Sequence, residues 1–465
     1  MCDGNTQMKA FIESVIGPDQ PSPRWLRVLV GVSLMWLAVW YASAALVHGR
    51  MNNVIMEYND QRVYMNYAKS FATPGFDGFI PRMRMPLYAR VLSFAARPDM
   101  TFEQLFPVAQ AFNIVLSLVC LLALFLFLRR WMGDWIGLCF CLVVAFQAFI
   151  LRAGYVQPEV MLTTFITLAC AQMVETLRRP AWWNALLAGV FLCAWFQTKA
   201  SAQGALGIFL AVLGLKWIFA GKGRRWPYAR AGVIVVLAYM LPMTSYLIKS
   251  WKTFGDPFYN VQSKYYMWCE PPIPGKEMQD EKHMLQKLGI DRSLDKLSAD
   301  PSQLPSAGRY FKRHNFGDIK ARETKGLKIM FRLAFLDYAL FCFMLAIFAA
   351  LAVWAISRRW RDAYRGGLDC KWEILFIVGL VTVFTMLFGW FTPLRVGPRL
   401  IESISLVPMF FCAAIAHHFL KNESETIAGI RVSMEKLFVL GFLIFWTVAS
   451  SMQVPDDLFA GYFGG

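Results

Sequence analysis

Residues 60–86 read DQRVYMNYAKSFATPGFDGFIPRMRMP and follow the first long apolar run of the chain. Residues that recur every four positions share one face of a helix. Three residues of this stretch have that spacing: Asp60, Tyr64 and Ala68. Arg82 and Arg84 follow, just before a second amphipathic stretch at 87–94. We interpret the stretch as a short helix that carries an acid and is followed by a cluster of basic residues.

The composition around this stretch is that of a membrane protein. Of the 465 residues, 57% are hydrophobic and only 17% are charged, with a mean hydropathy of +0.43. The apolar residues form runs of about 20, the length that crosses the hydrocarbon core, and such runs must be helical because lipid offers backbone groups no partner. We expect eleven spans: 28–47, 107–128, 136–152, 160–177, 184–198, 204–220, 231–248, 334–356, 372–391, 404–419 and 437–452.

The loop charges orient these spans. Five short loops (129–135, 177–183, 221–230, 357–371 and 420–436) hold 2, 2, 4, 5 and 3 Lys or Arg residues. The short loops on the other side (153–159, 199–203, 392–403 and 453–465) hold 0, 1, 2 and 0. The positive-inside rule then predicts a cytoplasmic N-terminus, an external C-terminus and an external position for Asp60.

We predict a single membrane domain over 1–465, with long outer loops at 48–106 and 249–332. The net charge of +16 follows from topology and from attraction to anionic lipid, so it does not indicate nucleic-acid binding. The chain shows no internal repeat, which argues against a transporter built from matching halves. Its Cys and His residues lack metal-site spacing, so the sequence gives no support for a metal or another cofactor.

Several motifs, in order along most of the chain, resemble the GT-C membrane glycosyltransferases. The branch that they resemble contains the protein O-mannosyltransferases and the lipid A aminoarabinose transferases. The motifs are Asp60-x3-Tyr64-x3-Ala68, Arg84-Met85-Pro86-Leu87-Tyr88, Tyr155-Val156-Gln157-Pro158-Glu159, Gln197-Thr198-Lys199, Phe254 to Tyr259, and Arg399 with Pro408. The family often has two adjacent acids where this chain has Asp60-Gln61. Several members carry a soluble C-terminal domain, which we do not expect in this chain.

The resemblance implies an all-α polytopic membrane enzyme that takes a sugar from a polyprenyl-phosphate donor. Asp60 and Glu159 would be catalytic, with Asp60 as general base. Four cations would bind the donor phosphate: Arg82, Arg84, Lys199 and Arg399. Glu57, Tyr64 and Arg395 are further candidates. Each also has a plainer interpretation, since acids cap helices and charged side chains at span ends reach water at little cost.

The chemistry suits such residues. A phosphate leaving group needs no general acid. The reaction then requires one ionised carboxylate to activate the acceptor, and cations to stabilise the departing phosphate. A one-step displacement of this kind would invert the anomeric carbon. We predict an integral membrane protein, bacterial inner membrane rather than endoplasmic reticulum, with its site facing the periplasm or exterior. The alternatives are a transporter or flippase of lipid-linked sugars, and a non-catalytic scaffold. Partners are the donor, membrane lipids and an acceptor that the sequence does not identify.

Overall fold

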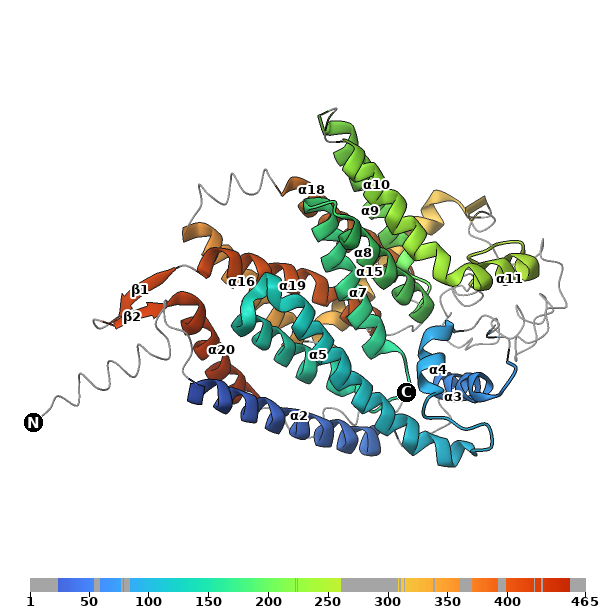
Figure 1. Ribbon diagram of the computed structural model, residues 1–465, viewed down its shortest axis with the longest axis horizontal. Helices are drawn as coiled ribbons and strands as arrows, with labels where there is room; N and C mark the ends of the chain where they lie inside the picture. The colour runs from blue at the N-terminus through green and yellow to red at the C-terminus, as the bar shows by residue number, and fades with distance from the viewer. Residues whose placement is uncertain are drawn as a thin grey trace, which may run out of the picture.

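The computed structural model describes residues 24–53, 59–76, 78, 84–221, 223, 225–260, 308, 311–312, 314–337, 339–358, 370–391, 399–421, 423–427 and 430–451. Within these residues the chain is a bundle of long helices with one small β-hairpin (Figure 1). The predicted all-α polytopic fold is confirmed.

The first half of the chain supplies α2 (Arg24–Asn52), α3 (Asn59–Ala72), α4 (Pro86–Leu92), α5 (Phe102–Val143), the π-helix η1 (Val144–Phe149), α6 (Ile150–Ala153), α7 (Glu159–Arg178), α8 (Trp182–Thr198), α9 (Ala202–Phe219), α10 (Arg225–Met240), the 3₁₀ turn η3 (Leu241–Met243) and α11 (Thr244–Phe254). The second half supplies α15 (Phe316–Asp337), α16 (Ala339–Arg358), α18 (Lys371–Phe391), α19 (Arg399–Leu420), β1 (Ser424–Ile427), β2 (Ile430–Ser433) and α20 (Met434–Ser451).

The stretch from α5 to α6 reverses direction at Gly133. This glycine has a φ of 68°, a left-handed value that breaks the helix between two apolar arms. The side-chain amide of Asn113 donates to the carbonyl oxygens of Ala153 at 3.0 Å and Tyr155 at 2.7 Å. In one straight helix these residues would be roughly 60 Å apart. The two arms therefore run antiparallel, with Gly133 at the turn.

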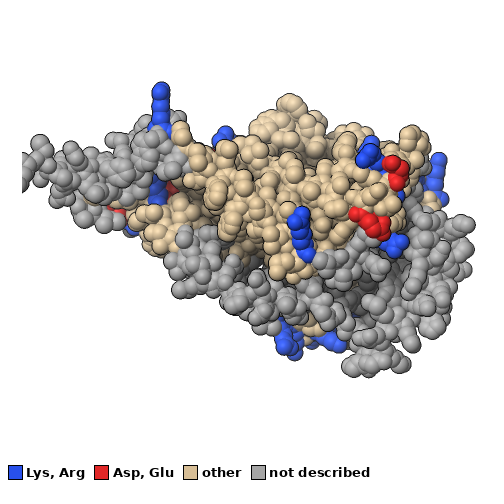
Figure 2. All heavy atoms as spheres, turned by 90° about the horizontal axis from the view of Figure 1, so that it is seen from below, with Lys and Arg blue, Asp and Glu red and all other residues tan. Residues whose placement is uncertain are grey.

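The described residues include seven helices that are long and apolar enough to cross a membrane. Side chains exposed on them are largely apolar, and Figure 2 shows a broad tan surface with few charged residues over the middle of the molecule. The stretch Phe102–Ala153 is one of the seven, although it is bent at Gly133. The chain is thus an integral membrane protein, and the number of eleven spans stays a prediction.

Long-range contacts sort the connecting segments into two ends of the bundle. At one, which we call the site end, Asn53 follows α2 and its amide nitrogen donates to the carbonyl oxygen of Gly154 at 2.9 Å. The Nδ2 atom of Asn260, after α11, contacts the sulfur of Met85, before α4, at 3.7 Å. Figure 1 shows α3, α4 and α11 together at this end, on the right. These segments all belong to loops predicted to lie outside.

The opposite end, the far end, holds the segments predicted to lie inside. There, the Nζ atom of Lys216 donates to the carbonyl oxygen of Leu177 at 2.7 Å and to Glu373 at 3.2 Å. Gly133 lies against His417 and Glu435, whose Nδ1 and Oε1 atoms are 3.2 Å apart. The predicted grouping of loops thus agrees with the contacts, while the direction in which the bundle crosses the membrane remains a prediction.

The helix α7 lies at the centre of the bundle. It is buried along nearly its whole length and contacts α5, α8 and α19. At its start, the hydroxyl of Thr163 donates to the hydroxyl of Ser403 in α19 at 2.9 Å. Thr163 and Ser403 each lie four residues after the start of their helix. The starts of α7 and α19 therefore both lie at the site end.

Two segments differ in detail from what the apolar pattern indicates. The inner loop expected at 420–436 contains an antiparallel pair, β1 and β2, in which Ser424 faces Ser433. In the second outer loop, the basic residues 316–332 belong to α15, which packs on α18. There the Arg322 guanidinium lies 4.5 Å from the Trp390 ring centroid, so this cation is held by a tryptophan face.

Candidate active site at one end of the bundle

Asp60 and Arg84 form an ion pair at the site end. Asp60 lies in the first turn of α3, where the helix dipole favours a negative charge. Arg84 lies two residues before Pro86, which begins α4 with the fixed φ that a first helical residue needs. The Asp60 side chain is 25% exposed and that of Arg84 11% exposed, so the pair is half-buried at a surface rather than sealed in the core.

The next residue, Gln61, is fully buried and turned away from this surface. Its Nε2 donates to Asn53 Oδ1 at 2.7 Å, and its Oε1 accepts from Asn53 Nδ2 at 2.9 Å. The same Oε1 accepts from the backbone N–H of Val156 at 2.8 Å. This geometry needs a side chain that both donates and accepts, which an ionised acid cannot do. The amide at 61, where the family often has an acid, therefore has a structural reason.

Val156 belongs to the turn that leads into α7, and this turn is tied down from several sides. Besides the bonds from Asn113, the Gln110 amide donates to the carbonyl oxygen of Gly154 at 3.1 Å. Gly154 also lies so close to Gly49 of α2 that a Cβ on Gly154 would be 2.6 Å from the Gly49 Cα. Three residues after Val156, Glu159 opens α7 and is 6% exposed. Gln61 thus links the helix of Asp60 to the turn that positions Glu159.

Two tyrosines pack together on the helices α3 and α4. Tyr64, one turn after Asp60, contacts Tyr88 of α4 edge to face, with ring centroids 5.1 Å apart. Burial, together with the nearby Tyr64 and Glu159, raises the pKa of Tyr88 well above its ordinary value of 10. Its hydroxyl has no hydrogen-bond partner among the described residues. The Tyr88 phenol is therefore neutral and buried, within electrostatic reach of Glu159.

Lys199 ends α8, on which α4 packs. The residue after Arg84, Met85, is buried in the same apolar cluster as Trp195 and Phe196 of α8. The last turn of α8 therefore lies next to the start of α4. Lys199 itself is half-buried.

The segment after α11 closes on the same place. Gly255 ends α11 in the left-handed conformation, with a φ of 71°, and Asp256 Oδ1 accepts from the N–H of Phe258 at 2.9 Å. Phe258 then contacts Phe196 of α8 edge to face, with centroids 5.7 Å apart. Asn260 reaches the sulfur of Met85. The tight turn thus brings a distant part of the chain against α4 and α8.

Most of the residues expected from the sequence therefore lie at one end of the bundle. The site end contains Asp60, Tyr64, Arg84, Glu159 and Lys199, and the backbone of Arg399 begins α19 at the same end. Three candidates lie outside the described residues: Glu57, Arg82 and Arg395.

Sequence reasoning missed the parts played by two residues. In the sequence, Gln61 is visible only as a departure from an acid pair, although an amide next to a candidate acid in a polar helix could have indicated a structural role. Tyr88 was only part of a motif, and nothing in the sequence reveals that its hydroxyl is buried. Among the described residues, no three His, Cys, Asp or Glu side chains are placed to hold a metal ion.

The overall fold is similar to that of a known oligosaccharyltransferase. The chain superimposes on the archaeal oligosaccharyltransferase AglB from Archaeoglobus fulgidus, in complex with an inhibitory peptide and a dolichol-phosphate, with a TM-score of 0.52 and 12% identity. The match covers 89% of this chain. The chain has the GT-C fold. The resemblance seen in the motifs is thereby confirmed at the level of architecture.

A second solved structure, ArnT from Cupriavidus metallidurans bound to undecaprenyl phosphate, is similar at a TM-score of 0.40 and 14% identity, over 84% of this chain and 77% of ArnT. This chain spans about half of the length of AglB, 54%. No family model and no curated protein matches the sequence. For this chain, the GT-C fold is therefore recognised from its tertiary structure and from short motifs, and not from overall sequence similarity.

Proposed function

We propose that this protein is a glycosyltransferase that moves a sugar from a polyprenyl-phosphate donor to an acceptor. The observation that carries the proposal is the ion pair of Asp60 and Arg84 at the site end of a GT-C fold, with Glu159 and Lys199 at the same end. The dolichol-phosphate of AglB supports a donor on a lipid carrier.

Asp60 is the general base in this proposal. As the acceptor oxygen or nitrogen bonds to the anomeric carbon, the bond from that carbon to the phosphate oxygen breaks and the electron pair leaves with the phosphate. The acceptor proton goes to the Asp60 carboxylate, which must be ionised beforehand. The cationic Arg84 and the helix dipole at the start of α3 both favour the ionised form. Attack opposite to the phosphate inverts the anomeric centre.

Arg84 and Lys199 stabilise the departing phosphate. A guanidinium has five N–H donors in a planar fork, so Arg84 can contact Asp60 and a phosphate oxygen together. Lys199 adds a compact charge from the end of α8. Arg399 begins α19 at the same end and is a further candidate, as is Arg82 by its position in the sequence. Positioned cations of this kind act on the charge that grows in the transition state.

Glu159 fits a supporting role. Glu159 is buried at the first turn of α7 and acts electrostatically on Tyr88. The turn before it is joined to the helix of Asp60 through Gln61. We propose that Glu159 orients the acceptor or the phosphate-binding cations. The site would face the periplasm or the exterior of an inner membrane, as the loop charges predict.

The decisive experiment compares Asp60→Asn with Asp134→Asn. Asp134 is a matched control because it is an exposed carboxylate that also pairs with an arginine, Arg129, but at the far end. Polyprenyl lipids and surface glycans of a deletion strain, complemented with each variant, are compared by mass spectrometry. We expect donor lipid to accumulate with Asp60→Asn and not with Asp134→Asn, with transfer by purified protein reduced roughly 10²–10⁴-fold.

The same experiment separates the alternatives. A flippase that lacks activity would leave donor lipid on the cytoplasmic leaflet, and purified protein would transfer no sugar in detergent. Normal transfer by Asp60→Asn would remove Asp60 from the mechanism. A non-catalytic scaffold would show no transfer in the wild type either.

A further inference from the structure

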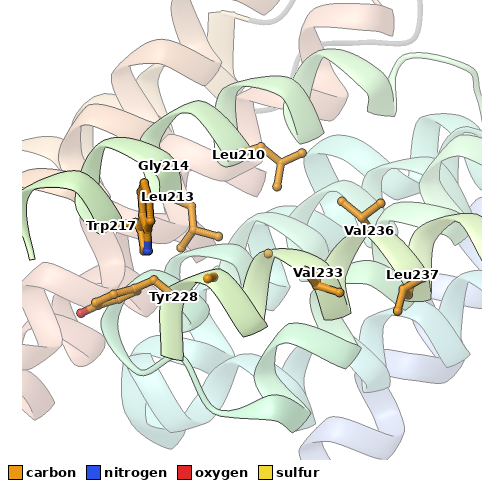
Figure 3. Close-up of a pocket in the computed structure, with 10 residues that line it drawn as sticks. Leu210, Leu213, Gly214, Trp217, Tyr228, Val233, Val236 and Leu237 are labelled. Carbon is orange, nitrogen blue, oxygen red and sulfur yellow. The ribbon is translucent and has the colours of Figure 1, made fainter. Parts of the chain in front are cut away.

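A hollow of about 400 Å³ lies between α9 and α10, facing away from the bundle core. Figure 3 shows Trp217 and Tyr228 at one end of the hollow and Leu210, Val236 and Leu237 toward the other. Its lining is almost entirely aliphatic or aromatic. We call this hollow the α9–α10 groove.

Small residues create the groove. Gly214 of α9 and Gly232 and Ala229 of α10 take part in its lining. A Cβ on Gly214 would meet no atom within 4 Å, so the space above it is open. A Cβ on Gly232 would be 3.2 Å from Leu213 Cδ2, so that glycine lets the two helices approach. The groove is thus formed by missing side chains rather than by separated helices.

A basic side chain borders one end of the groove, where it contacts the lining residue Trp217. Arg225, which starts α10, donates from Nε to the carbonyl oxygen of Ala220 and from Nη2 to that of Ile218, both at 3.1 Å. Its guanidinium carbon is 5.7 Å from the ring centroid of Trp217. The stretch 221–230 holds 4 Lys or Arg and no acid. A tryptophan and a tyrosine near a cation such as Arg225 are typical of the membrane–water interface.

The length of the groove matches one leaflet. From Tyr228 to Leu237 the helix rises roughly 14 Å, and half of a hydrocarbon core of about 30 Å is 15 Å. The groove therefore extends from the interface, where Trp217 and Arg225 lie, to the middle of the bilayer. An acyl chain of a phospholipid in that leaflet spans the same depth.

The basic end of the groove lies at the far end of the bundle. Lys216, one residue before Trp217, binds the carbonyl oxygen of Leu177 near the end of α7, whereas Glu159 starts α7. These positions are separated along α7 by roughly 27 Å. A lipid phosphate held at Arg225 is therefore in the leaflet opposite to Asp60, and the groove is not part of the candidate active site.

We propose that the α9–α10 groove binds an anionic phospholipid of that leaflet, with one acyl chain over Gly214 and the headgroup at Arg225. Two of the five Arg225 N–H groups cap α9, which holds the guanidinium at the groove end while its other donors can reach a phosphate oxygen. The excess of basic residues in 221–230 selects a lipid with net negative charge over a zwitterionic one. This inference does not depend on the enzymatic activity.

The first test fills the groove. Gly214→Leu adds a side chain to open space, and Gly207→Leu is the matched control: it lies two turns away on nearly the same face of α9, also has no atom within 4 Å of a new Cβ, and does not line the groove. Full-length protein is titrated with phosphatidylglycerol or phosphatidylcholine, and bound lipid is counted by native mass spectrometry. We expect Gly214→Leu to lose bound phosphatidylglycerol several-fold and Gly207→Leu to match the wild type.

The headgroup is tested with Arg225→Gln, which should weaken phosphatidylglycerol binding about fivefold, the effect of one basic side chain at an anionic surface, and leave phosphatidylcholine unchanged. Photoreactive phosphatidylglycerol with a diazirine in its acyl chain should label 210–237 of the wild-type protein, a readout that needs no variant. Labelling only elsewhere, equal binding of the two lipids, or equal loss in both leucine variants would overturn the proposal. A wild-type dimer that Gly214→Leu converts to a monomer would assign the groove to a second copy instead.

Discussion

Gln61 Oε1 accepts a hydrogen bond from the backbone N–H of Val156 at 2.8 Å, across 95 positions of sequence. This single bond joins the helix that carries Asp60 to the turn that leads into Glu159. Asn53 completes the link, because its amide bonds both Gln61 and the carbonyl oxygen of Gly154. The segments that carry the two candidate acids are thus joined through the neutral side chains of Gln61 and Asn53.

Removal of the Gln61 side chain tests whether this link positions the candidate acids or only stabilises the fold. Gln61→Leu removes the partner of the Val156 N–H and of the Asn53 side-chain oxygen, at a cost of about 1–3 kcal/mol for each buried group. We expect a lower melting temperature in detergent and a reduced transfer rate. Asn66→Leu is the control, since it removes an exposed amide from the same helix α3. A Gln61→Leu variant with wild-type kcat would show that the link serves stability alone.

Lys199 should act on the donor and not on the acceptor. Lys199→Ala is expected to raise the donor concentration needed for half-maximal transfer, because a cation near the phosphate is lost, while acceptor dependence stays unchanged. Lys199→Arg should restore part of the effect, since the guanidinium keeps the charge but differs in reach. Lys252→Ala removes an exposed lysine at the same end and serves as control. An unchanged donor dependence in both Lys199→Ala and Arg84→Ala would direct attention to Arg399.

Two buried tyrosines offer a matched pair. Within the described residues, the hydroxyls of Tyr88 and Tyr239 are both buried without a hydrogen-bond partner. Removal of such a hydroxyl is close to neutral for stability or slightly favourable, since no bond is lost. We therefore expect Tyr88→Phe and Tyr239→Phe to melt at or slightly above the wild-type temperature.

Activity should distinguish the same two variants. Of the two, Tyr88 contacts Tyr64 at the site end, whereas Tyr239 packs on Phe196 and Phe258. We therefore expect Tyr88→Phe to lower transfer through loss of a hydroxyl that donates to a substrate, and Tyr239→Phe to leave it unchanged. The raised pKa of Tyr88 keeps the phenol protonated through neutral pH, so its loss should leave the shape of the pH–rate profile between pH 6 and 9 unchanged. Equal activity of both variants would assign Tyr88 to packing.

Membrane orientation can be tested with tags at the two chain ends. The loop charges predict a cytoplasmic N-terminus and an external C-terminus. In intact spheroplasts, protease should remove a C-terminal tag and spare an N-terminal one. A protected C-terminal tag would imply an even number of spans and contradict the eleven-span prediction.

The apolar runs were enough to predict the class of fold. Because lipid cannot form hydrogen bonds with backbone groups, a run of about 20 apolar residues that crosses it must be a helix. The helices α7 and α18 begin and end within a residue or two of the predicted spans 160–177 and 372–391. The loop charges divide the connecting segments into two groups, and the long-range contacts agree with this division between the two ends of the bundle. Spacing alone placed Asp60 on a short helix, which is α3.

The partners of these residues were decided only by the tertiary structure. Nothing in the sequence shows that Gln61 faces Val156, that Tyr88 is buried within electrostatic reach of Glu159, or that Arg225 lies over Trp217 at the end of a groove. These relationships come from helix packing and from single hydrogen bonds between distant segments, and hydrophobic periodicity carries no information about which helix faces which. The sequence therefore determined that the helices cross a membrane and that Asp60 lies on a short helix after the first of them. The packing of α3, α4, α7 and α8 determined which side chains lie near Asp60.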